Sequence, residues 1–415
     1  MPDLDSVLHG RGHHATQTSG TSDVTQTVAR KHVHPFPARM APEIALGKIE
    51  LLTSEGDTVL DPMCGSGTVV RLAARSGRTG IGVDHDPLAV IITRTACHGS
   101  WAKNLEARAD ALVERACRLG GKLPDWIRRD EETSSFVDYW FAPEQAEDLA
   151  RLARVLMQAP PSDDPLRVAF SRMIVTKERG ASLARDTSHS RPHRVADTND
   201  YDVMAEFVRS AKKLESLVDD DDPVHRPRIR RDDARKLYFV PPASVDLACT
   251  SPPYLNAIDY LRGHRLSLVW MGWTVADIRA LRGESVGVER DRTGVRPEIH
   301  TVTKAATTMK ELPPRRQGMI LRFAHDMDRL SRSIARVVKR DGHLVMVVAN
   351  SQLDGVPISN ATICRRVVTQ NGFRLVGRSV RPLPARHRYL PPPSTSTGTL
   401  ATRMKEEIVY TFQRQ

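Results

Sequence analysis

The chain has 415 residues, 40% of them hydrophobic, and a formal net charge of +11 at pH 7. This length suits one large domain or two ordinary ones, and the positive excess favours a polyanionic partner such as nucleic acid. The polar N-terminus and the lack of an apolar stretch of about 18 residues predict neither a signal peptide nor a membrane span. Five cysteines without zinc-ligand spacing predict reduced thiols, a reducing compartment and no metal site.

The first 28 residues are rich in His, Gly, Ser and Thr, which predicts a flexible tail. Residues 57–86 then have the pattern of a strand, a glycine-rich turn, a helix and a second strand. The two strands end in Asp61 and Asp84. This order predicts a βαβ unit with parallel strands.

Residues 100–225 interrupt the α/β pattern. Apolar residues recur at helical spacing in 144–157 and 203–217, which predicts a mostly helical insertion. The segments on either side, 29–99 and 226–415, are then two parts of one catalytic domain.

The α/β pattern resumes in the last part of the chain. An apolar strand is expected at 245–249, an amphipathic helix at 318–338 and a final strand at 407–412. Between them we expect a polar, arginine-rich loop over 280–316 and a turn at Asp341.

The glycine-rich turn begins at the carboxyl end of the first strand, the edge at which doubly wound sheets bind ligands. Gly65 and Gly67 let the backbone turn sharply and approach a ligand closely. Asp61 suits an ammonium group, and Asp84 is placed to accept hydrogen bonds from ribose hydroxyls. No lysine follows the second glycine, so the turn is not a Walker phosphate loop.

Residues 61–68, DPMCGSGT, resemble motif I of the amino-methylating DNA methyltransferases. Asp84 matches their motif II acid, and residues 34–40 resemble motif X. Residues 231–235 resemble motif III, whose acidic residue is assigned to Asp233, with Asp232 as the alternative. The resemblance implies a Rossmann-like methyltransferase fold, with a doubly wound, mostly parallel seven-stranded sheet, and S-adenosyl-L-methionine as cofactor. The cofactor-binding residues that it implies are Asp61, Pro62, Cys64, Gly65, Ser66, Gly67, Thr68, Asp84, His85, Asp233, Phe36, Pro37 and Arg39.

Residues 250–254, TSPPY, follow the expected strand at 245–249 and are the candidate catalytic segment. An exocyclic amino nitrogen is a poor nucleophile because its lone pair is delocalised into the base ring. Ser251 Oγ and the Pro252 carbonyl can accept its hydrogens, and the prolines hold both acceptors rigidly. Tyr254 can stack on an extruded base. The expected catalytic residues, which promote direct transfer to nitrogen, are Ser251, Pro252, Pro253 and Tyr254.

This pentapeptide is similar to motif IV of the same family, and its serine form is the one usual in cytosine-N4 enzymes. The resemblance therefore implies methylation of N4 of cytosine in DNA, with adenine N6 as the first alternative. An RNA base-amino methyltransferase and a non-catalytic DNA-binding protein on a methyltransferase core are two further functions that the motifs leave open. Cytosine C5 chemistry needs a cysteine after proline, and no Pro-Cys pair occurs in the chain.

The segment between motif I and motif IV is much longer than the short βα connections of a plain sheet require. The predicted insertion at 100–225 is therefore the candidate target-recognition region. Its basic stretch, 177–194, suits a loop lying on DNA phosphates. The candidate DNA-binding residues are Lys177, Arg179, Arg185, His189, Arg191, Arg194, Arg262 and Arg265. We expect double-stranded DNA as a partner, restriction or defence-system proteins as candidate partners, and a cytoplasmic location in a prokaryotic or phage-encoded setting.

Overall fold

The computed structural model describes residues 32–36, 39–186, 192–219, 222–255, 259–286, 297–304, 306–307, 311–383 and 406–415. The expected N-terminal tail lies outside these ranges, as do three of the candidate site residues: Pro37, His189 and Arg191.

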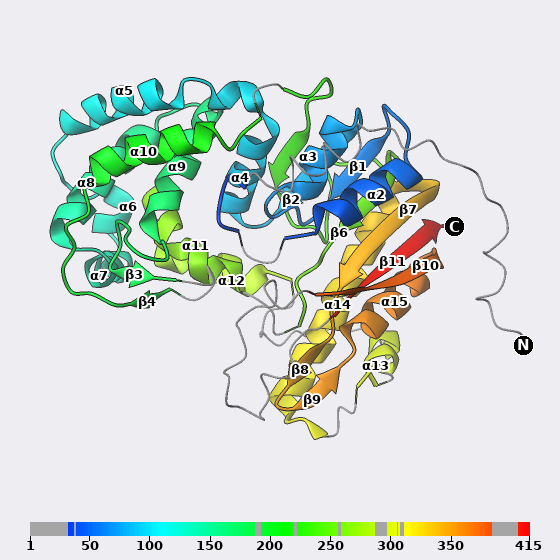
Figure 1. Cartoon of the computed structure of the whole chain (residues 1–415). Helices are drawn as coiled ribbons and strands as arrows, with labels where there is room; N and C mark the ends of the chain where they lie inside the picture. The colour runs from blue at the N-terminus through cyan, green and yellow to red at the C-terminus, as the bar shows by residue number, and fades with distance from the viewer. Residues whose placement is uncertain are drawn as a thin grey trace, which may run out of the picture.

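A seven-stranded sheet forms the centre of one half of the molecule (Figure 1). Its strands, in spatial order, are β10 (Phe373–Pro382), β11 (Glu406–Arg414), β7 (Val338–Val348), β6 (Val245–Thr250), β1 (Thr58–Asp61), β2 (Thr79–Asp84) and β5 (Arg228–Arg231). The strands from β7 to β5 run parallel, whereas β11 is antiparallel to both β7 and β10. The doubly wound, mostly parallel seven-stranded sheet that the resemblance implied is confirmed.

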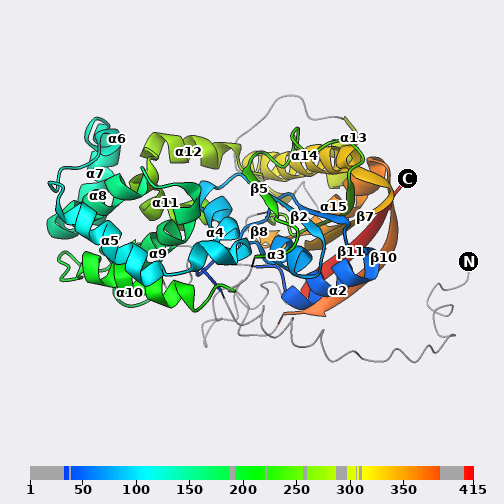
Figure 2. The same cartoon turned by 90° about the horizontal axis from the view of Figure 1, so that it is seen from above.

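Helices cover both faces of the sheet, because successive side chains of a buried strand point to opposite faces. In β1, Val59 packs with α2 (Pro42–Leu52) and α3 (Thr68–Arg75). Leu60 packs in the cluster that includes α14 (Pro314–Val337) and α15 (Asn360–Gln370). Figure 2 shows these layers, with α14 on one side of the strands and α2 and α3 on the other. Between the layers, the carboxyl ends of the parallel strands form one edge.

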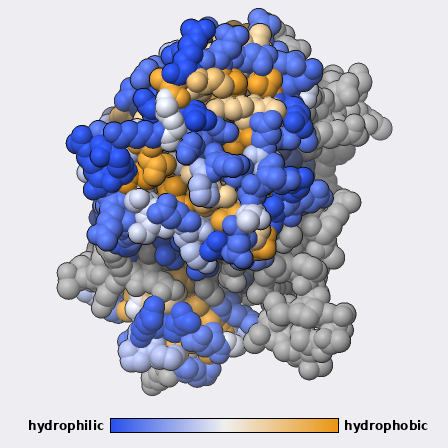
Figure 3. All heavy atoms as spheres, turned by 90° about the vertical axis from the view of Figure 1, so that its left-hand side faces the viewer, coloured by the Kyte–Doolittle hydropathy of each residue, from blue (hydrophilic) through white to orange (hydrophobic). Residues whose placement is uncertain are grey.

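The other half of the molecule is helical (Figure 1). We call it the helical body; its helices are α5 (Leu105–Cys117), α6 (Asp125–Arg128), α7 (Glu131–Trp140), α8 (Pro143–Leu156), α9 (Asp164–Ile174), α10 (Val203–Glu215), α11 (Tyr260–Leu268) and α12 (Val275–Glu284). The helices expected at 144–157 and 203–217 are α8 and α10. Together with α4 (Pro87–Cys97), these helices share one hydrophobic core. Hydrophilic side chains cover most of its outer face, with a few apolar patches between them (Figure 3).

The core of the helical body extends beyond the insertion expected at 100–225. Trp270 follows α11 and is buried, with its ring 5.2 Å from that of Phe141 in an edge-on contact. The Trp126 indole N–H donates to the Val269 carbonyl (2.8 Å). Segments on both sides of residues 250–254 therefore support the helical body.

Two local predictions were wrong. The polar loop expected over 280–316 contains the end of α12, all of α13 (Pro297–Lys304) and the first turn of α14, because Ile299 and Val302 supply a buried apolar face. The turn expected at Asp341 lies inside β7 instead. Asp341 has a φ of +64°, and the β6–β7 register shifts nearby, so the strand continues through an irregularity.

The described part of the chain contains no helix long and apolar enough to cross a membrane. In the same residues, no group of three or more His, Cys, Asp or Glu side chains is placed to hold a metal ion. All five cysteines are free thiols.

Candidate cofactor and base site

The turn after β1 has a shape that requires its glycines. Gly67 has a φ of +79°, and a Cβ there would lie 2.9 Å from Cγ2 of Thr93. Gly65 has a φ of +49°, and a Cβ there would lie 3.1 Å from the ring of Phe36. The Gly67 N–H closes the turn on the Cys64 carbonyl (2.7 Å). Larger residues would strain the turn and fill the space beside it.

Asp61 is buried at the carboxyl end of β1. Its Oδ1 accepts the N–H of Met63 (3.1 Å). Burial raises the pKa of Asp61 to about 7, and the charge of Asp84 contributes to the rise. A nearby cation favours the ionised form of such a carboxyl group. Asp61 therefore fits a ligand that carries an ammonium group.

Asp84 ends the neighbouring strand and accepts two backbone hydrogen bonds. Its Oδ2 accepts the N–H of Gly65 and its Oδ1 that of Asp86, each at 2.9 Å. Burial raises the pKa of Asp84 to about 6, and the charge of Asp86 adds to this. Each carboxylate oxygen can accept a second hydrogen bond, so ligand hydroxyls fit beside the backbone donors.

Other expected cofactor residues support the turn from within. Pro62 is buried. Cys64 Sγ lies 3.4 Å from Thr93 Oγ1, and Ser66 Oγ lies 3.1 Å from Thr68 Oγ1. Burial raises the pKa of Cys64 well above its ordinary value, so this thiol remains protonated.

A segment from the N-terminal side closes over the turn. Phe36 is buried, stacks on Tyr260 with ring centroids 5.1 Å apart, and lies against Gly65. Arg39 is half-buried. The structure thus brings Phe36 to the glycine-rich turn.

His85 and Asp233 lie beside Asp84. The Asp232 N–H donates to the Asp84 carbonyl (3.1 Å), which holds the segment after β5 next to β2. Asp233 forms an ion pair with Arg235 (2.8 Å). His85 Nε2 lies 3.2 Å from the Leu281 carbonyl, and burial lowers the pKa of the imidazole. The expected motif II and motif III residues therefore lie at the same edge of the sheet.

The candidate catalytic pentapeptide, residues 250–254, begins at the last residue of β6. The Ser251 hydroxyl donates to the Val347 carbonyl (3.2 Å), and its Oγ lies 3.4 Å from the Tyr254 hydroxyl. The Tyr254 hydroxyl in turn donates to Glu407 (3.5 Å). Burial, followed by the charge of Glu407, raises the pKa of Tyr254 well above its ordinary value. Tyr254 is therefore a neutral phenol.

The pentapeptide and the cofactor turn are adjacent. β1 and β6 pair in parallel, so Asp61 and Thr250 end neighbouring strands. Pro252 is buried and Pro253 half-buried immediately beyond. The acid expected to bind the ammonium group therefore lies beside the first residue of the expected base site.

Sequence reasoning missed two residues that contact this site. Glu407 comes from the last strand and reaches Tyr254, and Thr93 comes from α4 and packs on Gly67. Neither belongs to a motif, and no local spacing links either to its partner. Only the pairing of β11 with β7 and the packing of α4 against the turn bring them there.

The basic stretch of the helical body forms a short hairpin. β3 (Ala184–Arg185) pairs antiparallel with β4 (His193–Arg194). The guanidinium of Arg194 lies 5.0 Å from the ring centroid of Tyr139 and pairs with Asp197 (3.1 Å). Arg185 is half-buried, and its guanidinium donates to the Ala184 carbonyl (2.8 Å).

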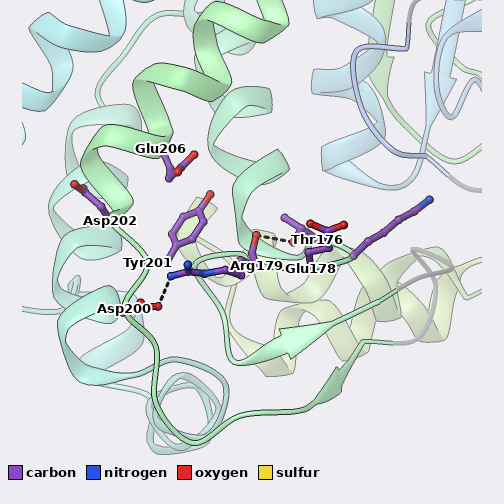
Figure 4. Close-up of a pocket in the computed structure, with 8 residues that line it drawn as sticks. Thr176, Glu178, Arg179, Asp200, Tyr201, Asp202 and Glu206 are labelled. Carbon is purple, nitrogen blue, oxygen red and sulfur yellow. Dashed lines mark hydrogen bonds and ion pairs between the residues drawn. The ribbon is translucent and has the colours of Figure 1, made fainter.

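Lys177 and Arg179 line a polar pocket of about 550 Å³ at the base of this hairpin (Figure 4). The Thr176 hydroxyl donates to the Arg179 carbonyl (2.7 Å), and the Arg179 guanidinium pairs with Asp200. Lys177 is exposed. The charge of Arg179 is thus offset locally.

The two candidate arginines of α11 lie in different environments. Arg262 is exposed. Arg265 is half-buried, with its guanidinium 5.3 Å from the ring centroid of Phe136 and 5.4 Å from that of Trp140. Arg265 therefore packs within the helical body, where burial lowers its pKa.

Comparison of the sequence with protein families gives a match to a DNA methylase family over residues 7–93. This range includes the glycine-rich turn and Asp84, and it ends before residues 250–254. No curated protein matches the chain.

Several solved structures resemble parts of the fold. A SAM-dependent methyltransferase from Methanosarcina mazei has a TM-score of 0.33 at 10% identity, covering 88% of this chain and 96% of that protein. A TehB-like SAM-dependent methyltransferase from Corynebacterium glutamicum has a TM-score of 0.30 at 9% identity, covering 89% and 87%. A putative DNA modification methylase from Thermus thermophilus, complexed with S-adenosyl-L-methionine, has a TM-score of 0.22 at 18% identity, covering 44% and 53%.

Proposed function

We propose that this protein is a DNA methyltransferase that transfers a methyl group from S-adenosyl-L-methionine to the N4 amino group of cytosine. The parallel pairing of β1 with β6 carries the proposal, because it places Asp61 and the glycine-rich turn beside the pentapeptide that begins at Thr250. The match to a DNA methylase family over residues 7–93 supports DNA as the substrate. The serine in the pentapeptide supports cytosine.

The residues at the sheet edge fit this cofactor. Asp61 is a buried carboxyl group suited to the ammonium of the methionine part, and Asp84 can accept the ribose hydroxyls. Gly65 and Gly67 leave space beside the turn that a Cβ would fill. When bound, the cofactor supplies a methyl group on a positively charged sulfur.

Ser251 is arranged to act as an acceptor. Its hydroxyl proton is directed to the Val347 carbonyl, so the lone pairs of Oγ are available for an amino hydrogen of the base. The Pro252 carbonyl provides the second acceptor, and two consecutive prolines restrict the backbone that carries it. Hydrogen bonds from both amino hydrogens to these acceptors favour a pyramidal nitrogen, whose lone pair is then no longer delocalised into the ring and can attack the methyl group.

Tyr254 is suited to hold the extruded base. Its ring packs beside the core on the α14 side of the sheet, and its hydroxyl is held by Ser251 and Glu407. A neutral phenol ring fixed in this way presents a face on which a planar base can stack.

A covalent route through cysteine does not suit the site. Cys249 lies two residues before Ser251 but is buried within β6. Burial raises its pKa far above the ordinary value, as it does for Cys64 beside the turn. The reactive form of cysteine is the thiolate, so transfer proceeds directly to nitrogen.

The test is single-molecule methylome sequencing of DNA from cells that express the protein, with Ser251→Ala and Tyr254→Ala as controls. A cytosine-N4 mark that disappears in both variants supports the proposal. A mark on adenine N6 would replace cytosine with adenine as the target base. Modified RNA without a DNA mark would change the substrate class, and calorimetry that detects no cofactor binding would overturn the enzyme assignment.

A further inference from the structure

A buried ionic cluster lies directly behind Asp233. Arg235 reaches both oxygens of this carboxylate, with Nε 2.8 Å from Oδ1 and an Nη 3.0 Å from Oδ2. Its other Nη donates to Asp326 of α14 (2.7 Å). The side chain of Arg235 is 3% exposed and that of Asp326 is fully buried. One guanidinium therefore joins an acid at the edge of the sheet to an acid inside the protein.

The same guanidinium is also attached to the helical body. The Nη that contacts Asp233 donates to the Glu284 carbonyl at the end of α12 (2.6 Å). Arg322 of α14 donates to the adjacent Gly283 carbonyl (3.2 Å). A guanidinium held by two carboxylates and a backbone carbonyl has a single orientation.

This orientation determines how many hydrogen bonds Asp233 can still accept. Two carboxylate oxygens offer about four acceptor positions. Among the described residues, the N–H and Nε of Arg235 occupy Oδ1, and one Nη occupies Oδ2. One acceptor position on Oδ2 is left. The side chain of Asp233 is 15% exposed, so part of it remains accessible from outside the core.

Asp233 is an acceptor and not a donor at neutral pH. Burial acts to raise its pKa, but the hydrogen bonds and charge of Arg235 outweigh burial and hold the pKa below its ordinary value. An ionised carboxylate attracts an amino group and repels a carbonyl oxygen.

Burying charged groups costs desolvation free energy, and apolar residues in their place are often as stable. Stability alone therefore does not explain this cluster. We propose that Arg235 and Asp326 are positioning residues that orient Asp233 so that its open acceptor selects an amino group on the cofactor's purine. This inference rests on the proposed function, because it takes the ligand to be S-adenosyl-L-methionine. Asp326 acts on Asp233 through Arg235, although its Oδ2 also lies 3.8 Å from Nε of Arg322. Because Asp326 is fully buried, it touches no ligand.

The test compares two ligands that differ at one purine position. S-adenosylhomocysteine carries a 6-amino group, whereas S-inosylhomocysteine carries a 6-oxo group. We expect the wild-type protein to prefer the adenosyl compound by about 10–100-fold in calorimetry, the range for one hydrogen bond to a charged group. Asp326→Asn should reduce this preference to below about fivefold and leave binding of the inosyl compound nearly unchanged.

The chain offers a matched control two residues further along α14. Asp328 is also fully buried and pairs with Arg332 (3.0 Å) and Asn371 (2.9 Å), away from Asp233. Asp328→Asn should lower the melting temperature but preserve the ligand preference. If Asp326→Asn fails to fold, Arg235→Lys serves instead, because lysine keeps the charge without the two-pronged contact.

The outcomes separate this inference from the proposed function. Failure of the wild-type protein to bind either ligand would overturn the proposed function. Equal binding of both ligands by the wild type overturns the inference alone. An unchanged preference in Asp326→Asn and Arg235→Lys, or an equal loss in Asp328→Asn, also overturns it, since the cluster would then be only structural.

Discussion

His264 and Asp86 form a buried pair that joins the helical body to the edge of the sheet. The imidazole Nδ1 of His264 lies 2.5 Å from Oδ2 of Asp86, although the two residues are separated by 178 positions. Asp86 also caps α4 through the Leu88 N–H (2.9 Å), and its own N–H donates to Asp84. The pair thus links α11, which follows the proposed catalytic pentapeptide, to the acid expected to hold the ribose.

Replacement of this histidine should destabilise the protein. His264→Phe keeps an aromatic ring of similar shape but leaves the Asp86 carboxylate buried with one partner fewer. We expect a loss of about 2–4 kcal/mol in the free energy of unfolding, measured by denaturant titration. In a cycle with Asp86→Asn, the two changes should be non-additive by about 1–3 kcal/mol. Strict additivity would show that the pair contributes no coupling.

Cofactor binding should depend on pH through Asp61. Folding raises the pKa of this carboxyl group from 3.8 to about 7, so the folded apoprotein holds the proton more tightly than the unfolded chain. The associated stability is full below pH 3.8 and is lost as the pH rises through 7. A bound ammonium favours the ionised form, so binding releases a proton below pH 7.

Calorimetry with S-adenosyl-L-methionine in buffers of different ionisation enthalpy measures this proton release. The affinity should fall by about tenfold per pH unit below pH 7. Asp61→Asn should bind weakly and without this pH dependence. An affinity that stays constant between pH 5.5 and 8 in the wild type would contradict the role assigned to Asp61.

The sequence predicts the parts of the fold that rest on local apolar patterns. β1, β2 and β6 are apolar runs that end in polar residues, and all three were expected. β5 was not expected, because its sequence RIRR buries only Ile229 and its arginines face solvent. β10 was missed for a similar reason: it is an edge strand in which Arg374 and Arg378 are exposed.

The same distinction holds for the site. Asp61, Gly67 and Ser251 belong to short motifs whose chemistry can be read without the fold. The contacts of Asp326 with Arg235, and of Glu407 with Tyr254, join elements that only tertiary packing brings together. Such long-range pairs have no spacing signal in a single sequence.

The pentapeptide should affect the chemical step more than cofactor binding. Ser251→Ala removes one acceptor for the amino group and should lower kcat by about 10²-fold. Because Ser251 lies beside the turn and not within it, the Kd for S-adenosylhomocysteine should change by less than about threefold. A methyl-transfer assay with tritiated cofactor and calorimetry measure the two effects separately.

The contributions of the Tyr254 ring and of its hydroxyl group to activity can be tested separately. Tyr254→Phe keeps the stacking surface and loses the contacts with Ser251 and Glu407, so it should retain activity within about tenfold. Tyr254→Ala also loses stacking worth about 1–3 kcal/mol and should be much less active. Equal loss of activity in the two variants would assign the role to the hydroxyl group instead of the ring.

DNA affinity should respond to the charges at the base of the β3–β4 hairpin. Asp200→Asn removes the partner of Arg179 and should strengthen binding to duplex DNA, whereas Lys177→Ala should weaken it. If a variant neutralises one DNA phosphate more or fewer than the wild type, the slope of log K for DNA binding against the logarithm of the salt concentration should change by about 0.9. Fluorescence anisotropy measures this slope. Arg265→Ala is the contrasting control: loss of its packing on Phe136 and Trp140 should lower the melting temperature and leave the slope unchanged. A slope that is equal in Asp200→Asn, Lys177→Ala and the wild type would place the DNA elsewhere on the protein.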